Sequence, residues 1–327
     1  MIPVTLGLLC ITAAAAAGQG VDRVELQLKW VTQAQFAGYY AAMAKGFYRS
    51  ERLAVGIRPG SPDLLPERVV AEGRAQFGVG WLSSLLVARE QGQPLVNIAQ
   101  VFSRSGAREI AFKSSGIKGP ADLRGRKVAV WFAGNEFPLL ATLDKYGIDP
   151  SRDLTLVRQP FDMGLLLKRQ VDAAAAMTYN EYKQVLDAGV KPGDLVVIDF
   201  NREGTAMLED GIFTRADWLE RPGNKDIAVR FVRASLRGWE FCRNRPDECV
   251  DIVLHESPLL GRAHQTWMMA EVNKLIWGPP ASRTPLGKMD QAAFTQTAEI
   301  ALKFGVITKP PEPAAYTREV WEMAKRK

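Results

Sequence analysis

The stretch from Leu28 to Tyr40, LKWVTQAQFAGYY, joins two different sequence patterns. The residues Val24–Trp30 alternate apolar and polar side chains, which is typical of a strand with one buried face. The residues Gln35–Gly46 that follow contain no proline, and we expect a helix there. A strand that passes directly into a helix is the repeating unit of α/β proteins. The rings and amides of this stretch should therefore lie at the carboxyl end of a strand, where open sheets bind ligands.

Strand and helix patterns alternate along the chain in two rounds. In the first round we expect strands at 54–58, 75–80 and 95–100 and helices at 66–72 and 83–91. In the second round we expect strands at 127–131, 154–158, 171–177 and 195–199 and helices at 136–146, 163–169 and 180–187. The segments 71–100 and 167–200 also share their order of elements. This alternation predicts two lobes, each with a largely parallel sheet that helices cover.

The remainder of the chain, from about Asp210, is mostly helical. Because the first lobe needs helices on its faces, we expect the chain to return to it. The expected organisation is a first lobe from 18 to 112, a second lobe from 113 to 207, and a return with C-terminal helices from 208 to 327. The crossings are expected near 107–115 and 201–213, with a ligand cleft between the lobes.

The first residues, MIPVTLGLLCITAAAAAGQG, carry no charged side chain and end in small residues. This pattern is typical of a secretory signal, and we expect it to span 1–17 with cleavage near Ala17. Cys10 lacks the small residues that usually precede a lipid-modified cysteine. No later stretch reaches the roughly 20 apolar residues of a transmembrane helix. We therefore expect a soluble protein that is exported to the periplasm.

Composition limits the classes of function. Of the 327 residues, 47% are hydrophobic and 24% are charged, which is ordinary for a globular protein. The net charge of +6 is spread along the chain without a dense run of Lys and Arg. We therefore expect no nucleic-acid partner.

Two cysteines, Cys242 and Cys249, lie on either side of Pro246 in the C-terminal part. In an oxidising compartment they can pair, because the proline interrupts the helix and lets the chain double back. The alternative is that both pack unpaired on a helical hairpin. Neither has a neighbouring His or acid at metal-ligand spacing.

Aromatic residues follow four of the expected strands. Trp30 and Trp131 end the first strand of each round, and Trp81 and Tyr179 follow the small-residue strand of each round. One interpretation is that each ring plugs the core of its own lobe. The other, which the matching positions favour, is an aromatic-lined cleft between the lobes, where rings stack on a flat ligand.

Polar side chains accompany these rings at the same strand ends. They are Gln33, Gln35, Ser83, Ser84, Asn135, Glu136, Asn180 and Glu181, with Asp210 near the second crossing. An amide followed by an acid at a helix start can serve as a helix cap. Two such pairs facing one cleft would also suit a heteroaromatic ring with amino groups, because carboxylates accept hydrogen bonds from exocyclic amines.

Signals for catalysis and for metal or cofactor binding are weak. The two histidines, His255 and His264, lie in the C-terminal helical part, outside the strand-end loops. The sequence has no G-x-S-x-G, no phosphate-binding G-x-x-x-x-G-K and no His or Cys cluster with metal-ligand spacing. We therefore expect a binding protein with no catalytic residue, no metal and no cofactor, rather than an enzyme.

Four segments resemble the NMT1/THI5-like family of periplasmic substrate-binding proteins, whose transport members deliver thiamine pyrimidine precursors to an ABC importer. They are LKWVTQAQFAGYYAAMAKGFY, SSGIKGPADLRGRKVAV, VDAAAAMTYNEY and GTAMLEDGIF, spread from Leu28 to Phe213. The resemblance implies an α/β protein with a two-lobed type II periplasmic binding protein fold that closes on its ligand by hinge bending. It also implies an ABC permease in the inner membrane as the partner, and we expect a monomer.

The resemblance further implies a pyrimidine or a comparable heteroaromatic ligand, held by the residues that match Trp30, Phe36, Tyr39, Tyr179 and Glu181. From the strand-end positions we add Gln35, Trp81, Ser83, Asn135, Glu136, Asn180 and Asp210 as candidate ligand-binding residues. The same family includes a synthase that makes the pyrimidine from pyridoxal phosphate and consumes one of its own histidines. This chain has no histidine in either strand–helix round and no clustered cysteines. The synthase is therefore the second interpretation, and a ligand-binding sensor domain is the third.

Overall fold

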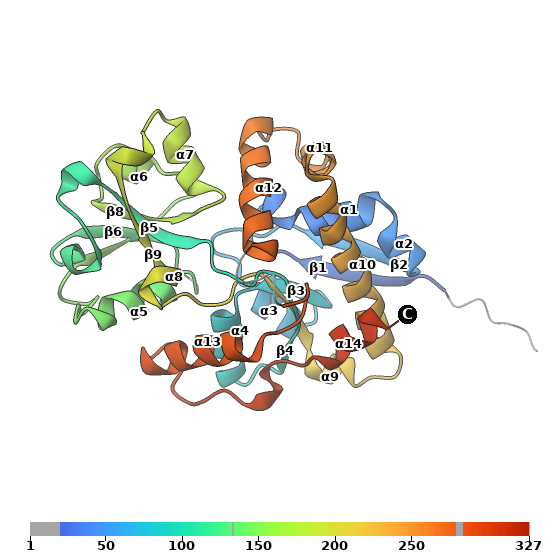
Figure 1. Ribbon diagram of the computed structural model, residues 1–327. Helices are drawn as coiled ribbons and strands as arrows, with labels where there is room; N and C mark the ends of the chain where they lie inside the picture. Colours follow the sequence, from blue (N-terminus) through green and yellow to red (C-terminus); the bar gives the residue numbers. More distant parts are fainter. Residues whose placement is uncertain (1–19, 133, 279–283, 327) are drawn as a thin grey trace, which may run out of the picture.

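The computed structural model describes residues 20–132, 134–278 and 284–326, which fold into two lobes (Figure 1). Each lobe contains one five-stranded sheet with helices packed against it. The segment 1–17, which we expect to be a signal peptide, lies outside the described residues. None of the helices within these ranges combines the length and the hydropathy that crossing a bilayer requires.

The elements follow the predicted alternation of strands and helices. The strands of lobe one are β1 Asp22–Gln27, β2 Leu53–Arg58, β3 Phe77–Gly80, β4 Leu95–Gln100 and β10 Gly211–Arg215. The strands of lobe two are β5 Ala107–Phe112, β6 Lys127–Val130, β7 Thr155–Arg158, β8 Ala173–Met177 and β9 Leu195–Asp199. The helices of the two rounds are α1 Ala37–Ala44, α2 Phe47–Ser50, α3 Pro66–Ala71, α4 Leu82–Glu90, α5 Phe137–Lys145, α6 Gly164–Leu167, α7 Glu181–Asp187 and α8 Phe200–Glu203. The C-terminal helices are α9 Ala216–Leu219, α10 Asn224–Asn244, α11 Pro246–Glu256, α12 Arg262–Trp277, α13 Gln291–Lys303 and α14 Glu319–Lys325.

The two sheets have the same topology. The order is β2-β1-β3-β10-β4 in lobe one and β7-β6-β8-β5-β9 in lobe two. In each sheet the first three strands pair in parallel, and the fourth strand is antiparallel to its neighbours. The antiparallel strand of each sheet directly follows a crossing from the other lobe and takes the fourth position in its own sheet.

The chain changes lobes in two short segments, 101–106 and 204–210, which lie between β4 and β5 and between α8 and β10. The boundary that we expected at residue 112 assigned β5 to lobe one, whereas β5 pairs with β8 and β9 in lobe two. The buried run of β5 fits the interior of either sheet equally well. Apolar pattern alone therefore does not assign such a strand to a lobe.

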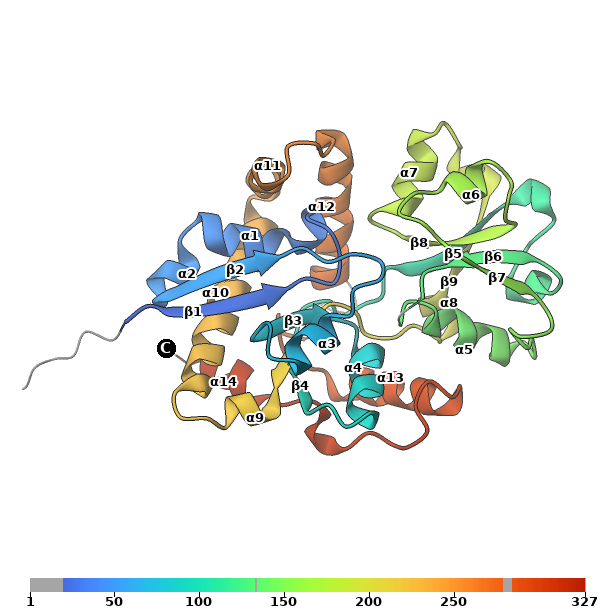
Figure 2. The same cartoon turned by 180° about the vertical axis from the view of Figure 1, so that it is seen from behind.

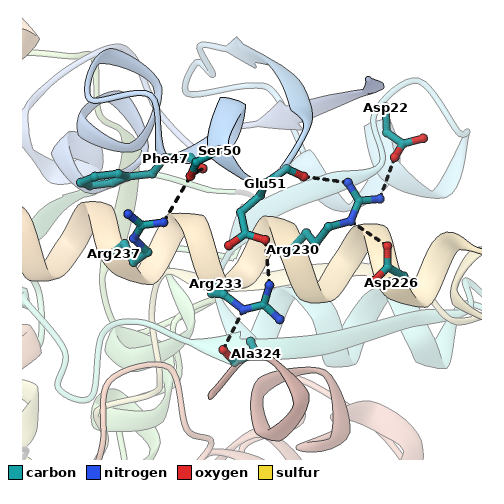
Figure 3. A network of polar contacts seen from close by, with 9 residues as sticks. All are labelled: Asp22, Phe47, Ser50, Glu51, Asp226, Arg230, Arg233, Arg237 and Ala324. Atoms are coloured by element: carbon teal, nitrogen blue, oxygen red, sulfur yellow. Dashed lines mark hydrogen bonds and ion pairs between the residues drawn. The ribbon is translucent and has the colours of Figure 1, made fainter. Parts of the chain in front are cut away.

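Lobe one is joined to the C-terminal helices by a row of arginines on α10 (Figure 3). Arg230 pairs with Asp22 at the start of β1, with the nitrogen and oxygen 2.6 Å apart. Arg233 pairs with Glu51 at 2.7 Å and also donates to the carbonyl oxygen of Ala324 in α14. These bonds link β1, the segment after α2 and the helix α14 to one helix, as the expected return to lobe one requires.

Cys242 and Cys249 form a disulfide between the end of α10 and the first turn of α11. Pro246 occupies the first position of α11, where its missing N–H leaves no hydrogen bond unmade. Both cysteines are fully buried. Of the two alternatives that the sequence left open, the structure has the disulfide.

Candidate functional site

A cavity lies between the lobes at the carboxyl ends of their central strands. Figure 2 shows the arrowheads of β1 and β2 pointing from lobe one toward lobe two. The cavity and its opening to solvent together span about 320 Å³. Its lining residues are Lys29, Trp30, Gln33, Gln35 and Trp81 from lobe one and Trp131, Asn135, Met177, Tyr179, Asn180 and Glu181 from lobe two. All of them lie at or just after the ends of β1, β3, β6 or β8, where open α/β sheets place ligand groups.

Aromatic rings from both lobes meet at this cavity. Trp30 lies edge-on to Trp131 across the cleft, with the ring centroids 6.0 Å apart, and edge-on to Phe161 at 5.2 Å. Trp131 is fixed in lobe two, because its indole N–H donates to the carbonyl oxygen of Pro160 at 3.0 Å. Such rings supply contact area for a flat ligand without requiring charge.

A hydrogen-bonded chain of side chains forms the polar floor of lobe one. The amide of Gln33 donates to Gln35, and the amide of Gln35 donates to Asp210, each at 2.7 Å. Asp210 has a left-handed backbone with φ of 47°. Its second carboxylate oxygen has no hydrogen-bond partner among the described residues. Burial raises the pKa of Asp210 to about 6, although its bond from Gln35 and the charge of Lys29 act in the opposite direction.

Lys29 is a buried cation in the cavity wall, with only 4% of its surface exposed. Its ammonium lies 5.7 Å from the centre of the Trp81 ring, within cation–π range. Burial raises the pKa of Glu67 and of Glu136, and the positive charge of Lys29 partly offsets both shifts. Lys29 therefore supplies a positive charge that favours the ionised form of the carboxyl groups in this part of the cleft.

An acid and an amide form the polar edge of lobe two. Glu181 accepts a hydrogen bond from the backbone N–H of Met177 at 3.0 Å and another from the side-chain amide of Asn180 at 2.5 Å. Burial raises the pKa of Glu181 to about 7, and these two hydrogen bonds limit the shift. Glu181 therefore exchanges its proton near neutral pH, so it can either donate or accept a hydrogen bond at the cavity.

The second amide–acid pair, Asn135 and Glu136, divides between two hollows. Asn135 lines the cavity and donates to the carbonyl oxygen of Phe132 at 3.0 Å. Glu136 accepts from the backbone N–H of Gly134 at 2.8 Å and faces a second hollow of about 910 Å³ between the lobes. Neither side chain makes a helix-cap hydrogen bond to α5 within the described part of the chain, so of the two roles that the sequence left open the structure does not show the cap.

The structure brings together most, but not all, of the candidate ligand-binding residues. Those that line the cavity are Trp30, Gln35, Trp81, Asn135, Tyr179, Asn180 and Glu181. Those that do not line it are Phe36, Tyr39, Ser83, Glu136 and Asp210. Phe36 and Tyr39 point into the core, and the ring of Tyr39 lies edge-on to Trp239 at 5.6 Å. Ser83 is fully buried in α4, and Asp210 lies behind Gln35.

Five residues at this site are absent from the candidate ligand-binding residues. Gln33 and Trp131, which the sequence placed at strand ends, line the cavity together with Lys29 and Met177. Phe161 contacts Trp30 from the loop after β7. Lys29 was open to prediction, since it directly precedes Trp30 at the end of the first strand. Phe161 follows the edge strand β7, and nothing in its local sequence distinguishes it from an ordinary loop residue.

Glu209 joins the two segments in which the chain changes lobes. Its carboxylate accepts hydrogen bonds from the hydroxyl of Ser105 and from the backbone N–H groups of Gly106 and Ala107, the latter two at 3.0 and 3.2 Å. Burial raises the pKa of Glu209 to about 8, despite these bonds. A single buried side chain thus fixes the first crossing to the second.

Direct contacts hold the lobes together around the cavity. Gly134 in lobe two lies so close to Ser84 in lobe one that a Cβ at this position would overlap the serine hydroxyl. At the rim, Arg158 of β7 pairs with Asp63 of lobe one at 3.0 Å, and both side chains are mostly exposed. The cavity is therefore enclosed by a closed arrangement of the two lobes.

Comparison with known proteins gives matches over most of the chain. Residues 33–249 match the NMT1/THI5-like family. The chain is 27% identical to a riboflavin-binding protein of Chloroflexus aurantiacus, over 91% of this chain and 86% of that protein. It is 24% identical to a formylaminopyrimidine-binding protein of Halalkalibacterium halodurans, over 75% and 74% of the two chains. It is also 26% identical to a 4-amino-5-hydroxymethyl-2-methylpyrimidine phosphate synthase of Legionella pneumophila, over 73% and 75%.

Solved structures match the whole fold at low sequence identity. The alkanesulfonate-binding protein of Xanthomonas axonopodis superposes with a TM-score of 0.67 at 16% identity, over 92% of this chain and 99% of that one. The periplasmic aliphatic sulphonate-binding protein of Escherichia coli gives a TM-score of 0.64 at 15% identity, over 89% and 90%. At these identities the likeness concerns the fold and not the ligand.

Proposed function

The chain belongs to the NMT1/THI5-like family and has the type II periplasmic binding protein fold. From this premise we propose that it is the extracytoplasmic solute-binding component of an ABC importer. Its ligand is a small heteroaromatic compound, and a thiamine pyrimidine precursor is the leading candidate. The protein works in the periplasm, delivers its ligand to a membrane permease and catalyses no reaction.

The observation that carries this proposal is the composition of the enclosed cavity. Its rings come from both lobes, and its polar groups are amides and carboxyls rather than a cluster of cations. An aminopyrimidine presents a ring nitrogen beside an exocyclic amine. A carboxyl with a pKa of about 7, such as Glu181, can donate to the ring nitrogen and accept from the amine. The cavity therefore complements an uncharged aminopyrimidine.

The name of one relative supports a second candidate ligand. The relative from Chloroflexus aurantiacus is named for riboflavin, and it matches 91% of this chain. A flavin is therefore the second candidate ligand.

Closure of the lobes provides the signal that the permease recognises. The ligand first contacts the rings and amides of lobe one, and lobe two then brings Tyr179 and Glu181 to its polar edge. Closure is favoured only through contacts that the ligand makes in the closed form and lacks in the open form. The packing of Gly134 against Ser84 is one of the contacts that limit how far the lobes can close.

Mass spectrometry of the compound retained by the purified protein, followed by calorimetry, tests the proposal. The probes are 4-amino-5-hydroxymethyl-2-methylpyrimidine, formylaminopyrimidine, riboflavin and pyridoxal phosphate. We expect both pyrimidines to give a measurable heat of binding and to lower the radius of gyration of the protein. Binding of pyridoxal phosphate alone, with loss of mass from a peptide histidine on turnover, would establish the synthase instead.

A further inference from the structure

Helix α12 stands at the boundary between the lobes, beside α7 of lobe two (Figure 1). One face of α12 binds the loop after β1, which carries Gln33 and Gln35 and is called here the ligand loop of lobe one. The side-chain oxygen of Gln265 accepts from the backbone N–H of Ala34 at 2.8 Å, and the sulfur of Met268 accepts from the backbone N–H of Gln35 at 3.2 Å. Because these bonds hold the start of the turn Ala34–Phe36, α12 is positioned by the loop that carries Gln35.

The neighbouring face of α12 binds the loop after β8, which carries Tyr179 and Asn180 and is the ligand loop of lobe two. Nε2 of His264 lies 2.7 Å from the side-chain oxygen of Asn180, and the indole N–H of Trp267 donates to the carbonyl oxygen of Thr178 at 3.1 Å. Residues three positions apart lie on the same face of a helix, as His264 and Trp267 do here. One helix therefore contacts the ligand loops of both lobes through two adjacent faces.

The bond from His264 continues to the acid at the cavity. The amide nitrogen of Asn180 donates to Glu181, so the amide oxygen of Asn180 faces His264 and accepts from Nε2 in the tautomer that carries its hydrogen there. If the Asn180 amide turned over, its NH₂ would face this N–H and its oxygen would face the oxygen of Glu181. In this tautomer the ring of His264 therefore selects one orientation of the amide.

We propose that His264 is a positioning residue of the ligand site, which fixes the amide of Asn180 and through it orients Glu181 toward the ligand. The inference rests on the proposed function, because the role of Glu181 is defined by the ligand. His264 lies on a helix joined to lobe one and Asn180 lies in lobe two, so the bond exists only while the lobes are closed. The site in lobe two is thus completed by a residue from the other side of the cleft.

Substitutions of His264 that keep or remove the N–H donor test the inference. His264→Phe keeps a planar ring and removes the donor, whereas His264→Gln keeps an N–H at similar reach. The probe is 4-amino-5-hydroxymethyl-2-methylpyrimidine, or riboflavin if only the flavin binds to the unmodified protein. We expect His264→Phe to weaken binding about tenfold, the effect of losing one buried hydrogen bond. His264→Gln should bind within about threefold of the unmodified protein.

The matched control is His255→Phe on the neighbouring helix α11, where the histidine side chain is 88% exposed and far from the cavity lining. It should leave binding unchanged. Equal loss in His264→Phe and His264→Gln, or no loss in either, would overturn the inference. Thermal unfolding of each variant identifies a variant that fails to fold. If His264→Phe does not fold, the affinity of His264→Gln is compared with that of His255→Phe.

A double-mutant cycle with Asn180→Ala separates positioning from general packing. If His264 acts through Asn180, then His264→Phe has no further effect on affinity once the amide is gone. Two effects that simply add would show that His264 acts by another route and would overturn the inference. Failure of the unmodified protein to bind either probe refutes the proposed function first, and that result is distinct from a change in the ratios between variants.

Discussion

Lobe one and lobe two have the same strand order, yet they support their ligand groups differently. In lobe one, Gln33, Gln35 and Asp210 form a hydrogen-bonded chain whose members all remain on one side of the cleft. In lobe two, the pair Asn180 and Glu181 receives a bond from α12, which belongs to the other side. The ligand-binding residues that each lobe contributes form a half-site. The half-site of lobe one is therefore assembled within its own lobe, whereas that of lobe two is complete only in the closed form.

The comparison teaches that a repeated sheet does not imply a symmetric site. The difference arises from the C-terminal helices, which were added to lobe one alone and have no counterpart in lobe two. A preorganised half-site lowers the ordering cost of first contact with the ligand. The half-site of lobe two depends on a bond from α12, so ligands are discriminated at the step in which the lobes close.

The largest expected effect comes from preventing closure. Gly134→Ala places a methyl group against Ser84 of lobe one, and it also strains a backbone with φ of 100°. The apparent affinity falls with the fraction of protein that can close, and we expect a loss on the order of 100-fold. Calorimetry with the pyrimidine probes, together with the radius of gyration in their presence, measures it.

Gly147→Ala is the matched control for this effect. Gly147 also has a positive φ, of 67°, but a Cβ there would meet no atom within 4 Å. The control carries backbone strain within lobe two without an obstacle between the lobes. Equal losses of affinity in the two variants would show that strain in lobe two, and not closure, sets the affinity.

The next largest effect of a substitution is expected at Trp30 and Trp131, the rings that form the aromatic wall on each side of the cleft. Trp30→Ala removes a ring that is partly exposed at the cleft, and we expect binding to weaken by about 2 kcal/mol with little change in the melting temperature. Trp131→Ala should lower both affinity and melting temperature, because Trp131 is also hydrogen-bonded within lobe two. Trp321→Ala, in α14, is the control that should affect stability alone. A large fall in melting temperature for Trp30→Ala would contradict the distinction.

The dependence of stability on pH tests the segment that joins the lobes. Because burial raises the pKa of Glu209 to about 8, the folded state keeps a proton that the unfolded state releases between about pH 4.5 and 8. Its stabilising contribution is complete below the unfolded pKa and is lost as the pH rises toward the folded pKa. Asp210 and Glu181 act in the same direction, up to about pH 6 and 7.

We therefore expect the free energy of unfolding to decrease between pH 5 and 8, and Glu209→Gln to reduce this slope by about 1.4 kcal/mol per pH unit. Urea unfolding at several pH values measures the slope. Glu220→Gln, on the exposed surface of lobe one, is the control that should leave it unchanged. An unaltered slope in Glu209→Gln would mean that this carboxyl is ionised throughout the range.

The smallest effect is expected at the rim. The ion pair between Arg158 and Asp63 spans the lobes, but its side chains are 66% and 82% exposed. Exposed pairs contribute about 0–1 kcal/mol and are screened by salt. Asp63→Asn should therefore change affinity by less than about fivefold at low salt and leave it unchanged in high salt. A larger, salt-resistant effect in calorimetry would show that the rim, and not the aromatic wall, controls closure.

Much of the fold was predictable because local pattern and global topology agree in it. The alternation of strands and helices, and the rings of Trp30 and Trp131 at matching strand ends, depend on neighbouring residues alone. The lobe of β5 was harder to assign, because a buried strand has the same pattern in either sheet. The first crossing was therefore expected several residues too far toward the C-terminus, whereas the second, 204–210, lies within the expected range 201–213.

The site was predictable only where it follows a strand end. Asp210 illustrates the limit: its sequence context indicated a ligand group, but its left-handed backbone turns the carboxylate onto Gln35 instead. His264 shows the other limit, because its partner Asn180 is 84 positions away and only the packing of α12 brings them together. No periodicity or motif in a single sequence encodes a contact of that kind.

The return of the chain to lobe one for its fourth strand also orders the folding of the newly made chain. The five strands of lobe two are consecutive, from 107 to 199, so its sheet can close as soon as this segment is available. The sheet of lobe one lacks its fourth strand until β10 has emerged, because β10 lies between β3 and β4. The half of the molecule that begins first in the chain is thus finished last, and during synthesis or export the edges of β3 and β4 await a partner.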